Sequence, residues 1–532
     1  MPYVRIFKIS ALSVVLLLAA VAWFWSPVLW SLVVLGPLLA LGLYDLVQRT
    51  HNVTRNFPVI GHLRYLFEAI RPEIQQYFVE SDISGRPFNR ELRSVVYQRA
   101  KNVLDTRPFG TIRDLYEDGT EWINHSLAPS SAPETAPRIL IGEGRCRKPY
   151  ASSLLNISAM SFGSLGKNAI LALNGGAKLG DFAHNTGEGG LSPHHLEPGG
   201  DLIWQIGTGY FGCRTPDGRF DPEEFAKKSC SPSVKMIEIK LSQGAKPGHG
   251  GILPASKVTA EISEIRGVPM GETVISPPHH SAFGTPRELL GFIGKLRELS
   301  GGKPVGFKLC VGRLDEFMGI CKAMVETGEV PDFIAVDGSE GGTGAAPMEF
   351  SNAVGVPLTE GLLAVHNCLV GCGVRDKIRV IASGKIVTGF NIIQRMAIAA
   401  DLCSAARPMM FALGCIQALR CNTNTCPVGV ATQDPDLGRG LDVEDKRVRV
   451  SNYHRNTVHA ALEILGAAGL SSTEELAPHH IIRRVDSTRI LSYADIYDYL
   501  EPAELLNSRI DKRGAHAEIF LRSWKQASPD HF

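Results

Sequence analysis

The sequence lacks an excess of charge of either sign. Its 532 residues include 55 lysines and arginines against 54 aspartates and glutamates, which gives a formal net charge of +1. Charged residues make up 20% of the chain, and the basic ones form no stripe. A nucleic-acid partner is therefore not expected, because binding a phosphate backbone needs clustered positive charge.

Paired cysteine spacing and a dinucleotide-binding fingerprint are also missing. The 11 cysteines show no pairwise spacing, which favours a reducing compartment over a disulfide framework. No G-x-G-x-x-G segment follows a predicted strand, so we do not expect NAD(P)H to bind to this chain. Four histidines of the central part of the chain lack metal-ligand spacing, so no mononuclear metal site is expected. They are His184, His194, His195 and His249.

The first 50 residues contain two long apolar runs. Residues 9–25 and 28–44 carry no charge and are separated by Ser26-Pro27. Each run is close to the length that spans a bilayer. Arg5 and Lys8 precede the runs and further arginines follow them, which predicts a transmembrane helical hairpin in the cell membrane with both ends cytoplasmic.

Two other interpretations of the N-terminus remain open. The basic start, the first apolar run and Ala20-Val21-Ala22 also suit a cleaved signal peptide. A single span or a re-entrant segment is the other alternative. The second apolar run, which follows directly, favours the hairpin, and so do Trp23, Trp25 and Trp30 near its turn.

The rest of the chain divides into three predicted parts. Residues 51–150 read as a helical N-terminal cap, and residues 441–532 as a C-terminal helical tail. Residues 151–440 alternate short apolar runs with amphipathic stretches, the pattern of repeated β/α units. Eight strands in this length predict an α/β fold, a (β/α)8 TIM-type barrel. The predicted strands are 154–160, 181–184, 235–241, 273–276, 305–310, 333–336, 379–382 and 401–405.

Glycine-rich segments gather where the predicted strands end. Examples are residues 185–190, 244–251 and 338–344. In a TIM-type barrel the active site lies at the carboxyl ends of the strands, so these loops are the predicted site.

Three cysteines follow the last predicted strand within twelve residues. Cys415, Cys421 and Cys426 form a C-x5-C-x4-C run, and Pro427 comes directly after it. A disulfide framework needs pairs and a structural zinc site usually has four ligands, so three thiols favour an iron–sulfur cluster with three protein-held irons. The alternative is three buried cysteines that act as small apolar side chains.

Six segments in register identify a family resemblance over residues 151–435. They resemble the FMN-binding synthase domain of the glutamate synthase large subunit, and the chain is similar to stand-alone, membrane-anchored relatives of that domain. The segments are MSFGSL (160–165), NTGEGG (185–190), EIKLSQGAKPG (238–248), ISPPHH (275–280), GGTGAAP (341–347) and ALGCIQALRCNTNTCPVGVATQ (412–433).

The resemblance implies an FMN site and a [3Fe–4S] cluster. Barrel flavoproteins hold the flavin phosphate at backbone amides after strands seven and eight. Arg407 adds a guanidinium suited to phosphate, with a surface arginine as the alternative. Lys240 is expected to place positive charge near the flavin. The implied FMN-binding positions are Ala159, Met160, Ser161, Lys240, Gly342, Ser383, Gly384, Lys385, Ala406 and Arg407, and the implied cluster ligands are Cys415, Cys421 and Cys426.

The resemblance also implies a 2-oxoglutarate site. Its cations would hold the substrate carboxylates, and the glutamate would manage protons as the α-imine is reduced. The implied catalytic residues are Glu188, Gln243, Lys246 and Arg266, with surface salt bridges as the alternative. The pair His279-His280 either lines the flavin pocket or fixes its loop.

Two departures from the family pattern affect the substrate. His249 stands where the family usually has glutamate, and Ile252 where it has glutamine. Loss of an amide that reached the substrate would cost about 1–3 kcal/mol. A related keto acid, or an imine with a bulkier apolar part, is therefore an alternative to 2-oxoglutarate.

The chain shows no amidotransferase domain with an N-terminal cysteine, so glutamine hydrolysis is not expected in this polypeptide. Ammonia or another amine would come from solution or from a separate amine-supplying protein. Electrons would come from a ferredoxin-like protein or a membrane donor. The alternative functions are a membrane-bound flavin electron-transfer module without synthase activity and a purely structural anchor.

Overall fold

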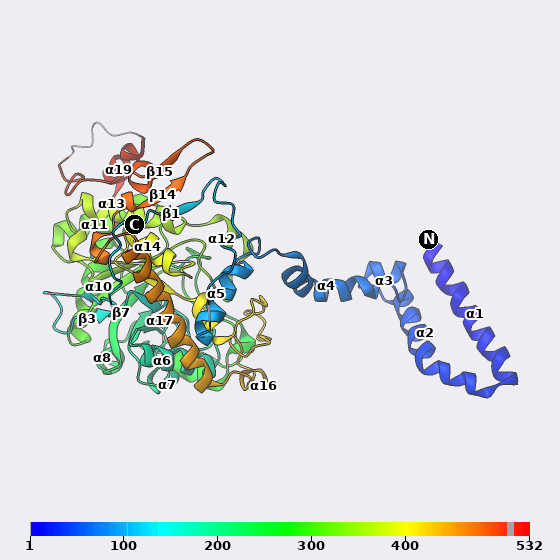
Figure 1. Ribbon diagram of the computed structural model, residues 1–532. Helices are drawn as coiled ribbons and strands as arrows, with labels where there is room; N and C mark the ends of the chain where they lie inside the picture. The colour runs from blue at the N-terminus through cyan, green and yellow to red at the C-terminus, as the bar shows by residue number, and fades with distance from the viewer. Residues whose placement is uncertain (1, 104, 134, 508–514) are drawn as a thin grey trace. The chain divides into compact units, whose positions relative to one another are not determined.

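The computed structural model describes residues 2–103, 105–133, 135–507 and 515–532. The chain divides into two compact units, Met1–Arg90 and Glu91–Phe532 (Figure 1). This boundary falls inside the segment 51–150 that the sequence predicts to be a cap. The first unit is helical, and every strand of the described chain lies in the second unit.

The first unit begins with a helical hairpin. Helices α1 (Pro2–Phe24) and α2 (Leu32–Val47) are joined by a 3-10 helix. By length and composition, Tyr3–Phe24 and Ser26–Val47 are each sufficient to cross a membrane. The helices approach closely at Gly42, where a Cβ atom would lie 2.1 Å from the Phe7 ring. Helices α3 (Asn52–Asn56) and α4 (His62–Ile74) follow.

Eight parallel strands close into a barrel in the second unit, which confirms the predicted (β/α)8 architecture. The order around the barrel is β4-β5-β6-β7-β10-β11-β12-β13. These strands are short and almost continuously buried, as expected when helices cover a parallel sheet. Their bounds are β4 Leu155–Ile157, β5 His184–Asn185, β6 Leu202–Ile206, β7 Val234–Lys240, β10 Val305–Leu309, β11 Phe333–Asp337, β12 Arg379–Ser383 and β13 Leu402–Ala405.

Helices between the strands surround the barrel. Several begin at side chains that cap the first turn: Asp221, Thr285 and Thr388 accept hydrogen bonds from backbone N–H groups. The long helix α17 (Val443–Ala467) packs against α6, α14 and α15. The main helices are α6 Lys167–Gly180, α8 Pro222–Ser229, α10 Pro286–Leu299, α11 Leu314–Thr327, α13 Leu358–Gly371, α14 Gly389–Ile398 and α15 Arg407–Leu413.

One predicted barrel strand is wrong and one is missing. Residues 273–276 contain β9 (Val274–Ile275), which pairs antiparallel with β8 (Ile252–Leu253) outside the barrel. The eighth barrel strand is instead β6, which lies between β5 and β7 and whose residues are all buried. Strand β6 was missed because it is buried on both faces and shows no alternation of apolar and polar residues. The predicted strand 181–184 also begins too early, because Asp181 has a φ of 53° and ends α6.

Segments before and after the barrel pair with each other. Strand β1 (Glu121–Ile123) runs antiparallel to β14 (Ile481–Arg484), which pairs with β15 (Ile490–Ser492). The segments predicted as a helical cap and a helical tail therefore both contribute strands to one small sheet. Helix α5 (Arg90–Lys101) precedes this sheet, and α19 (Ala515–Gln526) packs against α11.

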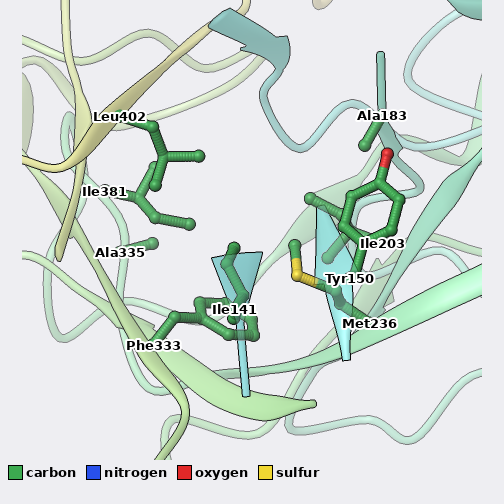
Figure 2. Packing of buried hydrophobic residues seen from close by; sticks show 9 residues of the cluster. All are labelled: Ile141, Tyr150, Ala183, Ile203, Met236, Phe333, Ala335, Ile381 and Leu402. Carbon is green, nitrogen blue, oxygen red and sulfur yellow. The ribbon is translucent and has the colours of Figure 1, made fainter. Parts of the chain in front are cut away.

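A hairpin packs against the apolar end of the barrel. Strands β2 (Ile139–Ile141) and β3 (Tyr150–Ser152) pair antiparallel, and Ile141 and Tyr150 join seven barrel residues in one buried cluster (Figure 2). The barrel residues lie at or near the amino ends of their strands, so the hairpin occupies that end. The seven are Ala183, Ile203, Met236, Phe333, Ala335, Ile381 and Leu402.

Replacing Ile141 by alanine tests the packing of this hairpin. The side chain is fully buried, so Ile141→Ala should lower the free energy of unfolding by about 2–5 kcal/mol. Denaturant titration in detergent measures the change. Leu140→Ala is the matched control and should cost less, because the neighbouring side chain points to the other face of the hairpin. Equal losses would show that Ile141 contributes no special packing.

Candidate functional site

Charged side chains replace apolar ones at the carboxyl ends of the barrel strands. Lys308 on β10 places its Nζ atom 3.4 Å from Oδ2 of Asp337 on β11 and 3.5 Å from the Ser158 hydroxyl. Ser158 and Ser383 bring their hydroxyl oxygens within 3.2 Å of each other. Lys240, the last residue of β7, lies beside Lys308 in the strand register. This end of the barrel is therefore polar, in contrast to the opposite end.

Glu188 is held among three cations. Lys240 Nζ lies 2.8 Å from Glu188 Oε1, and both side chains are largely buried. Burial alone would raise the pKa of Glu188, but the charges of Lys240, Lys246 and Arg266 outweigh burial and hold the pKa below its usual range. Glu188 is therefore a carboxylate at neutral pH.

Glycines give this carboxylate its space. A Cβ atom at Gly251 would lie 2.4 Å from Glu188 Oε1, and one at Gly207 would lie 2.7 Å from Glu188 Cβ. Larger residues at these positions would displace the carboxylate.

Arg266 connects this cluster to the loop after β4. Its NH2 group donates to the Phe162 carbonyl at 2.9 Å and lies 3.4 Å from the Ser161 hydroxyl. The guanidinium also stacks on the Phe211 ring, 5.2 Å from its centroid. Burial lowers the pKa of Arg266 to about 10, which still leaves it charged at neutral pH. The structure thus brings the predicted substrate arginine against the predicted flavin loop.

Lys246 carries a positive charge without a partner. Its side chain is 3% exposed, and among the described residues its ammonium has no hydrogen-bond or ion-pair partner. Burial lowers the pKa of Lys246 to about 8, although Glu188 opposes this shift. Three cations around one carboxylate leave positive charge in excess, and a buried unpaired charge is costly. The arrangement is therefore suited to an anionic ligand.

The remaining predicted substrate positions lie in nearby loops. Gln243 is half-buried in the loop after β7, and no hydrogen bond of its side chain joins it to Glu188 in the described chain. The His249 ring packs edge-on against Phe350, with centroids 5.1 Å apart, and Ile252 begins β8. The structure thus places both departures from the family pattern between β7 and α9 (Ala260–Arg266), the helix that carries Arg266.

The predicted flavin positions lie at the same end of the barrel. Ala159, Met160 and Ser161 follow β4, and Ser383 ends β12. The next two residues turn sharply, with φ angles of 144° at Gly384 and 52° at Lys385.

Arg407 is more than a surface side chain. It begins α15, directly after Ala406, and is partly buried. Its NH2 group donates to the Glu340 carbonyl at 2.6 Å. A Cβ atom at Gly342 would lie 2.6 Å from Arg407 Nε, so the glycine-rich loop after β11 rests on this arginine.

Sequence analysis missed a buried carboxyl group beneath the site. Asn185 Nδ2 and Gln205 Nε2 donate to Glu238 Oε1 at 2.8 and 2.7 Å. Burial raises the pKa of Glu238, and the nearby Lys308 opposes the shift. The signal was present in the period of β7, because Met236, Glu238 and Lys240 are two residues apart and therefore lie on the same face of the strand.

His280 fixes its loop against the end of β7. The Tyr210 hydroxyl accepts from Ala282 N and donates to His280 Nδ1, both at 3.0 Å. His280 Nε2 then donates to the Lys240 carbonyl at 2.9 Å. Burial lowers the pKa of His280 to about 4, which agrees with this neutral form, whereas His279 is exposed.

The three cysteines of the C-x5-C-x4-C run lie in the loop after α15. All three are free thiols, and the Tyr97 hydroxyl donates to the Cys415 carbonyl at 2.6 Å. Burial raises the pKa of Cys415 to about 12, and the charges of Cys421 and Cys426 add to this effect. The thiols are thus near one another, but across the described residues no three such side chains are close enough to hold a metal ion.

Lys257 joins the cysteine loop to the loop after β4. Its buried ammonium donates to the carbonyls of Ala431 and Ser164 at 2.8 and 2.9 Å. Gln433 Nε2 makes a parallel connection to the carbonyls of Leu165 and Gly163 at 2.8 and 3.1 Å. The predicted flavin loop and the predicted cluster loop are therefore tied together.

Removing the Lys257 ammonium should loosen this connection. Lys257→Met leaves two carbonyls without their donor, at a cost of about 1–3 kcal/mol per unsatisfied buried group. We expect faster amide hydrogen exchange in residues 160–166 and 415–433. The exposed Lys167→Met is the control and should leave exchange unchanged. Unchanged exchange in Lys257→Met would show that Gln433 suffices.

These observations define a (β/α)8-barrel protein with a cationic site at the carboxyl ends of its strands. The sequence profile described as "Conserved region in glutamate synthase" matches residues 125–471, which include the barrel and every predicted site residue. The chain belongs to the glutamate synthase family, which confirms the resemblance drawn from the six segments.

Named relatives support the assignment. Glutamate synthase large subunit-like protein YerD of Bacillus subtilis (strain 168) is 39% identical over 489 residues, which cover 84% of this chain and 93% of YerD. Archaeal glutamate synthase (NADPH) of Methanocaldococcus jannaschii is 38% identical over 323 residues, 60% of each chain. The present chain therefore spans less than two thirds of the archaeal protein.

Solved structures with a similar chain trace are more distant. A flavocytochrome b2 variant with sulfite bound has a TM-score of 0.42 and 11% identity, and covers 85% of this chain and 92% of its own. Mandelate oxidase with (S)-2-phenylpropionate has a TM-score of 0.40 and 14% identity, with coverages of 75% and 97%.

Proposed function

We propose that the protein is a glutamate-synthase-type oxidoreductase that converts 2-oxoglutarate and ammonia, or a close analogue, to the amino acid. The observation that carries the proposal is the buried group of Lys240, Lys246 and Arg266 around Glu188. A dicarboxylate would supply the negative charge that this group lacks. The matching profile and the archaeal relative are both named for glutamate synthase, which also supports the proposal.

The same end of the barrel fits FMN. Backbone groups at Gly384, Lys385 and Arg407 would hold its phosphate, and residues 159–161 would lie along its ring system. Two further features support the fit: the φ angle of Gly384, which side chains rarely allow, and the positions of Lys240 and Lys308 in register on neighbouring strands. Bound FMN would supply hydride transfer.

Within this site the protein residues have separate tasks. Lys246 and Arg266 would bind the substrate carboxylates and orient its α-carbon, because both are buried and cationic. Glu188, which Lys240 would keep ionised, would act as the base that accepts a proton from the substrate nitrogen. The Tyr210–His280 pair would fix the backbone of Lys240.

A [3Fe–4S] cluster on Cys415, Cys421 and Cys426 is part of the proposal. The thiols are free, and their charges are close enough to interact electrostatically. Lys257 would place positive charge beside an anionic cluster. Their described positions do not form a ligand group, so binding would require this loop to draw together. When bound, the cluster would pass single electrons.

We also propose that the hairpin of α1 and α2 anchors the protein in the cell membrane. Its length, its apolar composition and the exposure of Trp23, Trp25 and Trp30 support this. The catalytic unit would then be cytoplasmic. Electrons would come from a ferredoxin-like protein or a membrane donor, and the amine from solution or a separate protein.

A membrane-bound electron-transfer module without synthase activity is the second candidate. His249 and Ile252 favour it, because they stand where the resembling family usually has glutamate and glutamine. Absorption spectra of the anaerobically purified protein decide between the two. Dithionite-reduced flavin that reoxidises on addition of 2-oxoglutarate and ammonia supports the synthase. Flavin that stays reduced supports the module or another keto acid, and a colourless protein contradicts both.

Substitution of the two buried cations, Lys246 and Arg266, tests the substrate site. Lys246→Ala and Arg266→Ala should each raise the KM for the keto acid about tenfold or more, since a hydrogen bond to a charged group contributes about 1.5–3 kcal/mol. Flavin content, measured by absorbance, should be retained. The exposed Lys178→Ala is the control. Unchanged steady-state kinetics in both variants would exclude these residues from the site.

Substrate affinity should fall as pH rises past about 8. The pKa of Lys246 is about 8 without ligand, and a bound carboxylate raises the pKa of an ammonium. Above this pH Lys246 is deprotonated in the free protein, and binding of the anion requires that it take up a proton. The Kd for 2-oxoglutarate, measured by calorimetry between pH 6.5 and pH 9.5, should increase only in the upper part of the range. A constant Kd would show that Lys246 does not contact the anion.

A further inference from the structure

Helix α4 carries an exposed apolar stripe. Five apolar side chains recur at positions i, i+3, i+4, i+7 and i+11 and therefore face one side of the helix. Their exposed fractions range from 38% to 58%. Arg64 and Glu68 form an ion pair at 3.9 Å on another face. The α4 stripe consists of Leu63, Leu66, Phe67, Ile70 and Ile74.

The apolar exposure continues past the end of the helix. Tyr77, Phe78 and Val79 lie in the following π-helical turn, Gln75–Val79, and Phe78 is 85% exposed. A stretch of this length with large apolar side chains in water is unusual in a soluble protein and indicates a covered surface.

The start of α4 is fixed to the end of the hairpin. Asp45, a buried residue on α2, accepts from Val59 N at 2.9 Å, and its other oxygen lies 2.8 Å from His62 Nε2. Gln48 donates to the His51 carbonyl at 2.7 Å and the Thr54 hydroxyl at 3.0 Å. These contacts keep α4 next to the last turn of α2.

The start of α1 lies at this same end. The Tyr3 and Phe57 rings have centroids 4.9 Å apart, and the ring of Phe7 contacts Gly42. Basic residues are grouped in the adjoining sequence: Arg5, Lys8, Arg49 and Arg55. If the hairpin crosses a bilayer, this end lies at the headgroups, where basic side chains are favoured.

We infer that the α4 stripe lies in the interfacial layer of the bilayer that holds the hairpin. The inference rests on the proposed membrane anchor. Lipid is favoured over a second copy or a protein partner because the hydrogen bonds of Asp45 hold α4 at the level where the apolar phase begins. An interfacial helix buries its apolar side at the acyl boundary and turns its charged side to the headgroups, as the division of α4 allows.

Lipid-dependent quenching tests this placement in the full-length protein. A genetically encoded fluorescent amino acid is introduced at Leu66 on the stripe or, as the matched control, at Glu68 on the charged side. The protein is reconstituted in phosphatidylcholine–phosphatidylglycerol vesicles with nitroxide-labelled lipid. Quenching at position 66 should exceed that at position 68 about threefold or more. Equal quenching would overturn the inference.

A third label at Leu17, in the middle of α1, separates this inference from the anchor. Quenching at 17 with none at 66 would leave the anchor standing and overturn the placement of α4. No quenching at any position would overturn both. Energy transfer between copies labelled at 66, with no quenching by lipid, would show instead that a second copy covers the stripe.

Substitutions within the stripe complete the test. In protein labelled at position 66, Leu63→Gln with Ile70→Gln should reduce quenching at least about twofold while quenching at 17 is retained. Glu68→Gln, on the charged side, should leave quenching at 66 unchanged. Unchanged quenching at position 66 in the Leu63→Gln, Ile70→Gln variant would contradict the inference.

Discussion

The alternation of side chains along β7 connects the stability of the barrel with its chemistry. Met236 joins the apolar cluster at the amino end, Glu238 lies in the middle, and Lys240 reaches Glu188 at the carboxyl end. Because a strand turns every second side chain inward, a shift of one residue would bury the wrong set. The β2–β3 hairpin packs on the apolar end, so the polar groups converge at the opposite end.

The loops at the carboxyl end act together because they share buried hydrogen bonds. Lys257 and Gln433 tie the cysteine loop to the loop after β4, and Arg266 joins that loop to Glu188. A change in one loop would therefore be felt by the others. This arrangement suits a protein in which a carboxylate-binding site, a flavin and an electron carrier must keep fixed positions, as we propose here.

The sequence predicted most of the barrel because seven of its strands begin or end near clear breaks in pattern. Strand β6 was the exception: Leu202–Ile206 is buried throughout, and Gln205 is polar only because it serves Glu238 inside the barrel. The segment 273–276 contains two adjacent β-branched apolar residues but pairs with β8 outside the barrel. Local pattern cannot separate these two strands, since pairing between distant residues decides where each belongs.

The sequence by itself determined the family, the barrel and the apolar helical hairpin of α1 and α2. The family follows from ordered motifs, and the barrel and the helical hairpin follow from the pattern of apolar residues. The resemblance also grouped Glu188, Lys246 and Arg266 in one predicted substrate site and assigned Lys240 to the flavin. Only the tertiary structure decided that their charges act on one carboxylate, that Lys246 is left without a partner, and that Lys257 joins two loops. Such facts depend on burial and on distances between residues far apart in the chain, because electrostatic effects grow as water is removed.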